Sequence, residues 1–178
     1  MKHATIFEPD EPNELLRGWL LHAHKGRDRH DLAARHLDQR RYLLGGTAAF
    51  ISGIVGTSTF TVLQSSTARA VQVVVGVLAI AAAVLTSVQA VLDFGARAER
   101  HRIAGVRYKT VIRELEQLGI GAVVNLKLDA PILTEIRQRL DALEEEMPVV
   151  PPRIYERIEQ RYRDVTFVDA VRPASTAA

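Results

Sequence analysis

The stretch AVQVVVGVLAIAAAVLTSVQAVLDFGARAERHR, residues 70–102, decides the fold. From Val71 to Leu92 it holds no ionisable side chain, and it then turns into a run of arginines. A helix rises about 1.5 Å per residue, so a segment of this length matches a hydrocarbon core of about 30 Å. A core helix of a soluble protein seldom runs this far without a polar face. The stretch therefore predicts a helix that spans a membrane.

A second uncharged segment, LLGGTAAFISGIVGTSTFTVL, occupies residues 43–63. Glycine and β-branched residues disfavour helices in water, whereas membrane helices tolerate both. The connector at 64–70, QSSTARA, is short and polar, so two helices joined by it must run antiparallel. The alternative is a pair of buried helices in a soluble bundle. We expect a transmembrane hairpin over 43–94, with spans at 43–63 and 71–92.

Arginine and lysine are distributed unevenly around this hairpin, and the connector holds only Arg69. The outer flanks hold Lys25, Arg27, Arg29, Arg35, Arg40 and Arg41 on one side and Arg97, Arg100, Arg102, Arg107 and Lys109 on the other. Short cytoplasmic segments carry the excess of these residues in membrane proteins. Both termini are therefore predicted to face the cytoplasm.

The rest of the chain predicts an all-α fold, because apolar residues recur every three or four positions. The repeats are Leu15, Leu16, Trp19, Leu20 and Ala23; Val111, Leu115 and Leu118; Ile132, Ile136, Leu140, Leu143 and Met147; and Ile154, Ile158 and Tyr162. Gly26 marks a predicted break, and the helix after residue 94 is predicted to continue the second span. We expect a disordered N-terminus (1–12), a cytoplasmic amphipathic helix region (13–42), a cytoplasmic helical region (95–165) and a flexible tail (166–178).

Two segments carry a resemblance: RHLDQRRYLLGGTAAFISGIVGTSTF at 35–60 and FGARAERHRIAGVRYKTVIRELEQL at 94–118. They resemble the SLATT family, the SMODS- and SLOG-associating two-transmembrane effector domains, over roughly residues 16–163. The resemblance implies a membrane effector of a bacterial anti-phage conflict system, located in the inner membrane. Such effectors are commonly encoded beside a nucleotidyltransferase that makes a nucleotide second messenger.

The chain departs from fused members of that family, because it carries no recognisable sensor or nucleotidyltransferase domain. Its own cytoplasmic helices or a partner must then detect the signal, which makes a nucleotide second messenger or a sensor protein a candidate partner. The expected function is a homo-oligomer that forms a pore in the lipid bilayer and causes cell death or growth arrest. The alternative is a non-conducting, membrane-anchored interaction module that recruits a soluble partner.

Small residues recur four apart in both predicted spans. They are Gly45, Ala49, Gly53 and Thr57 in the first, and Ala79, Ala83 and Ser87 in the second. Small residues at this spacing let helix backbones approach closely in lipid, where no hydrophobic effect drives association. Such seams predict helix packing either within the hairpin or between neighbouring copies.

A polar stripe also follows the second span, made of Gln72, Thr86, Gln89 and Asp93. Polar groups in spanning segments usually face a protein interior or water, so the stripe is a candidate pore lining. A structural reading is open as well. Gln72 and Asp93 lie near the interfaces, Asp93 can pair with Arg97, and Thr86 can bond its own helix backbone. Gln89 is then the position most in need of a partner.

The cluster Arg97, Arg100, His101 and Arg102 predicts contact with anionic headgroups or, alternatively, with a nucleotide. The pairs His22 and His24, and His30 and His36, have poor spacing for a metal site on one helix, so we expect solvated surface histidines and no metal. The absence of cysteine excludes disulfides and thiolate chemistry. No nucleotide-binding or nucleophile motif is present, so we expect neither an enzyme nor a cofactor. The small net charge of +2 disfavours nucleic acid as a partner.

Overall fold

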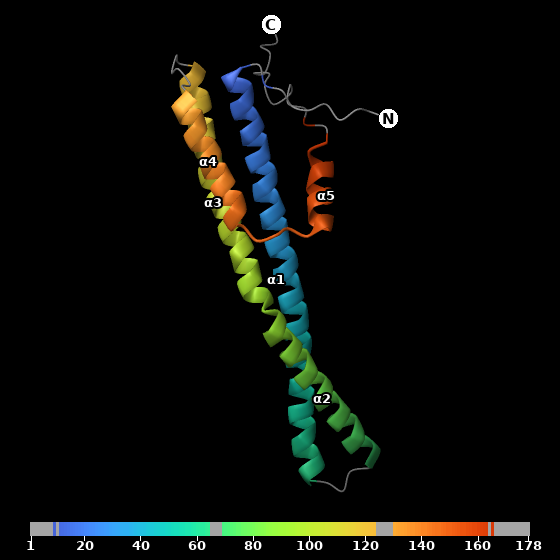
Figure 1. The fold of residues 1–178 in the computed structure, drawn as a ribbon. Helices are drawn as coiled ribbons and strands as arrows, with labels where there is room; N and C mark the ends of the chain where they lie inside the picture. The colour runs from blue at the N-terminus through green and yellow to red at the C-terminus, as the bar shows by residue number, and fades with distance from the viewer. Residues whose placement is uncertain (1–8, 10, 65–68, 124–129, 164, 166–178) are drawn as a thin grey trace. The chain divides into compact units, whose positions relative to one another are not determined.

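The computed structural model describes residues 9, 11–64, 69–123, 130–163 and 165, and the side chains of these residues except 59–64 and 120–123. The described residues are all-α (Figure 1). The helices are α1 (Pro12–Gln64), α2 (Arg69–Leu92), α3 (Phe94–Val123), α4 (Ala130–Glu146) and α5 (Pro152–Arg161). The predicted flexible tail, and the predicted N-terminal segment up to residue 8, lie outside these residues.

Proline sets several of the helix limits. Pro12 and Pro152 are the first residues of α1 and α5, and Pro131 is the second residue of α4. Proline suits the first turn of a helix, because its fixed φ is helical and its missing N–H would be unpaired there anyway. Pro148 follows the end of α4 and cannot continue a helix. Proline residues thus mark the starts of α1, α4 and α5 and follow the end of α4.

The chain divides into two compact units. Unit 1 contains residues 1–33 and 100–178, and unit 2 contains residues 34–99. Both α1 and α3 contribute residues to each unit, whereas α4 and α5 belong to unit 1 and α2 to unit 2.

Unit 1 is organised around an apolar core that α1, α3 and α4 share. Its buried members are Leu16, Ala23, Tyr108, Val111, Ile112, Leu115, Ile136, Leu140 and Leu143, with Trp19, Leu20, Leu118, Ile132, Leu133 and Met147 packed against them. This core confirms the stripes predicted from the repeat spacing on α1, α3 and α4, except for Leu15, which is not among its residues. On α5, the predicted apolar face is buried at Ile154 and Ile158.

The predicted break at Gly26 is wrong, because α1 runs through this position without interruption. The glycine is needed for a close approach rather than for a bend. A Cβ added at Gly26 would lie 2.5 Å from ring atoms of Tyr108 on α3. Gly105 on α3 has the same role, because an added Cβ would lie 2.5 Å from the Asp31 carboxylate. The two glycines thus bring α1 and α3 close together.

Unit 2 contains the most apolar helix among the described residues. The segment Arg69–Gly119, which is α2 followed by most of α3, is long and apolar enough to cross a membrane. Only 6% of its most apolar window is buried. The first predicted span, 43–63, is helical within α1, but its side chains from residue 59 onward lie outside the described residues. A second membrane-crossing helix therefore stays a prediction.

The helix after residue 94 follows the second span directly, as predicted, with a break of one residue between them. Asp93 separates α2 from α3 and has a φ of 38°, in the left-handed region that side chains other than glycine seldom adopt. Its carboxylate accepts a hydrogen bond from the backbone N–H of Ala96 at 3.2 Å. Aspartate tolerates this conformation and caps a new helix, so the chain restarts as α3 one residue later.

Candidate functional site

A shallow groove runs between α1 and α2 in unit 2. Both walls are made mostly of small residues: Ser52, Val55 and Gly56 from α1, and Ala79, Ala82, Ala83, Thr86, Ser87 and Ala90 from α2. Ala82 is buried at the bottom, while Gly56 and Ala83 are exposed. The groove is open along its length because its side chains are too short to fill it. A helix of another molecule could approach both backbones here.

The hydroxyl groups around the groove bond to their own helices. Thr86 donates to the carbonyl of Ala82 at 2.9 Å, and Ser87 donates to the carbonyl of Ala83 at 2.8 Å. On α1, Thr57 donates to the carbonyl of Gly53 at 3.0 Å. Such bonds satisfy the hydroxyl proton without a partner helix.

Gln89 lies against α1 and does not point away from the protein. Its side-chain Nε2 would be 3.0 Å from a Cβ added at Gly45, and its Oε1 would be 3.4 Å away. The amide is therefore accommodated because position 45 has no side chain. Gln89 is half-buried, whereas Gln72, at the other end of the polar stripe, is exposed. Of the predicted stripe, only Thr86 lines the groove.

A small polar pocket lies next to Gln89 at the junction of α2 and α3. It is lined by Arg41, Gln89, Asp93, Phe94, Gly95 and Ala96. The Arg41 guanidinium lies close to the bare backbone of Gly95, where an added Cβ would be 3.3 Å from its Nη1. Asp93 already caps α3, so its carboxylate serves the helix start. The pocket joins two members of the predicted stripe with Arg41, which the sequence placed only among the basic flanks.

The predicted small-residue seams divide into two groups. Ala79, Ala83 and Ser87 of α2 line the groove. On α1, Gly45 contacts Gln89, whereas Ala49, Gly53 and Thr57 are exposed. Within the described residues, a Cβ added at Gly46, Gly53, Gly56 or Gly76 meets nothing within 4 Å. Among the described residues, position 53 of the first seam thus has room for an added Cβ.

The basic cluster after α2 is divided as well. Arg97, Arg100 and Arg102 are exposed, as headgroup contact requires. His101 is only 5% exposed and lies inside unit 1, where its Nδ1 is 2.9 Å from the Nδ1 of His30. A buried ring facing another histidine is not placed to touch a headgroup.

The expectation of solvated histidines is wrong for His30, which is 4% exposed. Its ring stacks on Tyr108 with the centroids 5.7 Å apart, and it lies 5.1 Å from the His101 ring. Burial, together with repulsion from the nearby His101 and Arg29, lowers the pKa of His30 to about 4. His30 is therefore neutral at pH 7. The described residues contain no group of three ligands that could hold a metal.

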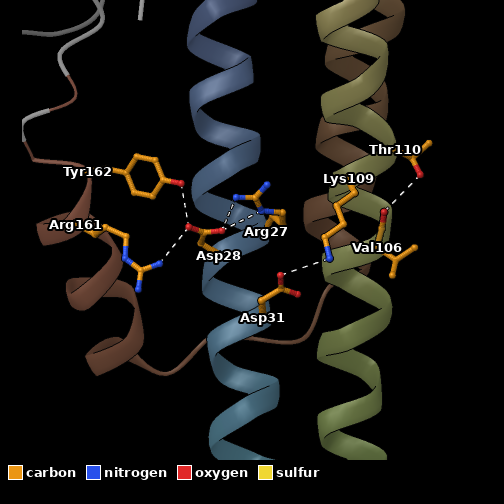
Figure 2. A network of polar contacts seen from close by, with 8 residues as sticks. All are labelled: Arg27, Asp28, Asp31, Val106, Lys109, Thr110, Arg161 and Tyr162. Atoms are coloured by element: carbon orange, nitrogen blue, oxygen red, sulfur yellow. Dashed lines mark hydrogen bonds and ion pairs between the residues drawn. The ribbon is translucent and has the colours of Figure 1, made fainter. Parts of the chain in front are cut away.

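Polar contacts between α1 and α5 form a charged network in unit 1. Figure 2 shows Asp28 between two elements: Arg27 donates to it from α1, and Arg161 and Tyr162 donate to it from α5 and the residue after it. One turn away, Glu159 of α5 accepts from Lys25 and Arg29. No spacing rule places residues 130 positions apart together, so sequence analysis could not find this network.

Fold and site define an all-α protein with a helix able to cross a membrane and a groove of small residues beside that helix. Comparisons with family models, curated proteins and solved structures find no match for this chain. Its function therefore has to be argued from its own residues.

Proposed function

We propose that this protein is a membrane effector that oligomerises and forms a pore or channel in the bacterial inner membrane, causing cell death or growth arrest. The resemblance of residues 35–60 and 94–118 to the SLATT family supports the anti-phage setting. The observation that carries the proposal is an apolar helix whose surface is left exposed beside an open groove of small residues.

Exposed apolar side chains in unit 2 support insertion into lipid. They include Leu43 and Phe50 of α1 and Val73, Val77, Ile80, Val84 and Val91 of α2, with exposures from 56% to 83%. Soluble monomers rarely expose contiguous apolar surface on this scale. Exposure of these apolar side chains to water costs free energy, whereas contact with acyl chains does not. The basic flanks then favour a hairpin with both termini in the cytoplasm.

The groove supports association between copies. In lipid, helices associate through close packing, and small residues permit the closest approach. A Cβ added at Gly53 or Gly56 would meet nothing of the described chain within 4 Å, which leaves room for a neighbouring helix to approach. A ring of subunits packed through this groove would bring the hydroxyl oxygens of Thr86 and Ser87 to the interface.

The rival function is a non-conducting membrane anchor that recruits a soluble partner. It needs the same apolar helices, but it needs neither the groove nor the polar positions beside it. Arg97, Arg100 and Arg102 fit anionic headgroups in either case, or a nucleotide signal in the first. The two functions therefore differ in what substitutions in the groove do.

Dye release from liposomes containing the purified full-length protein distinguishes them. We expect wild type to release dye and to migrate as an oligomer, and we expect Gly56→Leu to lose both properties. Gly76→Leu is the matched control, because position 76 is equally open but lies outside the groove. Gln89→Leu should reduce release by removing the amide beside Gly45. Absence of release from wild type, combined with capture of a soluble partner, would establish the anchor instead.

A further inference from the structure

The last helix, α5, is set apart from the rest of unit 1. It is ten residues long, and it follows a segment at 147–151 that contains two prolines. Val149 in that segment is 92% exposed. None of the residues of α5 belongs to the core that α1, α3 and α4 share. The core can therefore stay intact when α5 is undocked.

Two buried isoleucines and two carboxylates hold α5 in place. Ile158 is fully buried and Ile154 is 8% exposed. Glu159 forms ion pairs with Lys25, at 2.9 Å, and with Arg29 of α1. The Arg29 guanidinium also lies over the Tyr155 ring, 3.8 Å from its centroid. Two cations of α1 thus converge on a single carboxylate of α5.

The second carboxylate of this interface, Asp28, belongs to α1. Asp28 of α1 accepts from the Tyr162 hydroxyl at 3.0 Å and from Arg161 at 3.3 Å. Each side of the interface thus contributes one carboxylate. Asp28 of α1 accepts from donors at the end of α5, and Glu159 of α5 accepts from basic residues of α1. This reciprocity fixes the register of α5 on α1.

The contact between α5 and α1 has features that allow α5 to detach. An isolated helix of ten residues is marginal in water, so α5 depends on docking for its helicity. Much of the docking is ionic and only partly shielded, because the Glu159 and Arg161 side chains are 37% and 56% exposed. Partly exposed ion pairs weaken as salt screens them. Arg29 additionally keeps a buried Nε without a partner among the described residues, so the docked state leaves one donor unsatisfied.

We propose that α5 is an ionic latch: docked on the Lys25–Arg29 segment of α1, it restrains the protein, and its detachment releases the conducting state. This inference rests on the proposed function for the conducting state, whereas the latch itself is a property of unit 1. Residues 25–29 and the first predicted span both belong to α1. Detachment therefore changes the contacts of a helix that also contributes to the membrane unit.

Hydrogen exchange of the full-length protein in detergent tests the latch directly. Glu159→Gln and Asp28→Asn should each raise the exchange rate of α5 amides about tenfold, since the acceptor loses its charge and the ion pairs are lost. Glu156→Gln is the matched control, because it makes the same change of charge on an exposed position of the same helix. Amides of α4 should keep their protection in every variant, which shows that the core stays folded. In wild type, raising salt from about 0.1 M to about 1 M, where the Debye length falls from about 10 Å to about 3 Å, should also speed α5 exchange.

Dye release from liposomes tests the consequence. The Glu159→Gln and Asp28→Asn variants should release dye several-fold faster than wild type, and Glu156→Gln should match wild type. Unchanged α5 exchange in both variants and at high salt would overturn the latch. Faster exchange with release equal to that of wild type would overturn its role in gating. Faster exchange with no release from any variant, wild type included, would instead show that the proposed pore is wrong and that α5 gates nothing.

Discussion

Unit 1 and unit 2 are both helical, yet they treat their apolar residues in opposite ways. In unit 1 the apolar stripes of α1, α3 and α4 face one another and form a closed core. In unit 2 many apolar residues of α2 are exposed, and small residues line a groove between α1 and α2. Burial against protein stabilises the first unit, whereas the second leaves exposed a helix that is long and apolar enough to cross a membrane.

Truncation of one large apolar residue in each unit gives the largest expected difference between the two units. Leu140→Ala in unit 1 removes a side chain that is 5% exposed, and we expect unit 1 to lose about 2–5 kcal/mol of unfolding free energy. Ile80→Ala in unit 2 removes one that is 67% exposed and should leave unit 1 unchanged. Urea unfolding in detergent, followed by fluorescence of the single tryptophan Trp19, measures both, because Trp19 packs against the core. Equal losses in the two variants would refute the division.

The second prediction concerns pH. The pKa of His30 is about 4 in the folded protein, against an ordinary value near 6.5, because burial disfavours its charged form and His101 and Arg29 add repulsion. The unfolded chain therefore binds more protons than the folded one between about pH 6.5 and pH 4. Unit 1 should be most stable above pH 6.5 and should lose stability as the pH falls through this window, by about 3 kcal/mol.

Substitution of His30 isolates this effect from other titrating groups. The groups that face it are His101 and Tyr108 of α3 and Arg29 of α1, and none of these is changed by His30→Gln. In that variant, the Trp19 unfolding midpoint should vary less between pH 7 and pH 4.5 than in wild type. An identical pH dependence in the two proteins would show that His30 is not the titrating group.

A third prediction compares two glycines of α1. Gly26→Ala places a Cβ 2.5 Å from the buried Tyr108 ring, and overpacking of this kind costs about 1–3 kcal/mol. The better helix propensity of alanine offsets at most about 1 kcal/mol of this cost. Gly56→Ala in unit 2 meets nothing in the described chain, so the Trp19 unfolding midpoint should not fall. A stabilised Gly26→Ala protein would mean that α1 and α3 lie further apart than described.

The sequence was sufficient wherever local periodicity decides the outcome. It predicted the core residues Ile136, Leu140 and Leu143, because a helix buries one stripe whatever its partner is. It failed at Gly26, where the choice between a break and a close approach depends on Tyr108, far away in the chain. It failed at His30 for the same reason. At Asp93 a helix propensity argument could not detect one left-handed residue between two helical segments.

The polar contacts between α1 and α5 could not be predicted from the sequence. Asp28 and Glu159 each look like ordinary solvated charges on amphipathic helices. Burial alone would raise the pKa of Glu159, but hydrogen bonds from Lys25 and Arg29 outweigh it and leave the pKa below its ordinary value. The pKa of Asp28 is lowered in the same way, by Arg27 and Tyr162 acting against burial. Both carboxylates therefore favour the docked helix at neutral pH, and this contribution is lost only as the pH falls through the lowered pKa values.

The smallest expected effect is that of a substitution at exposed ion pairs of α4, which serve as a comparison for the ion pairs between α1 and α5. Arg139 of α4 also contacts two carboxylates, Glu114 at 2.9 Å and Glu135 at 2.7 Å, yet its side chain is 53% exposed. Exposed ion pairs are screened and cost side-chain entropy to form. Arg139→Met should therefore leave both the Trp19 unfolding midpoint and α5 exchange unchanged. A shift comparable to that of Glu159→Gln would mean that the number of ion pairs, rather than their shielding between α1 and α5, determines how tightly α5 is held.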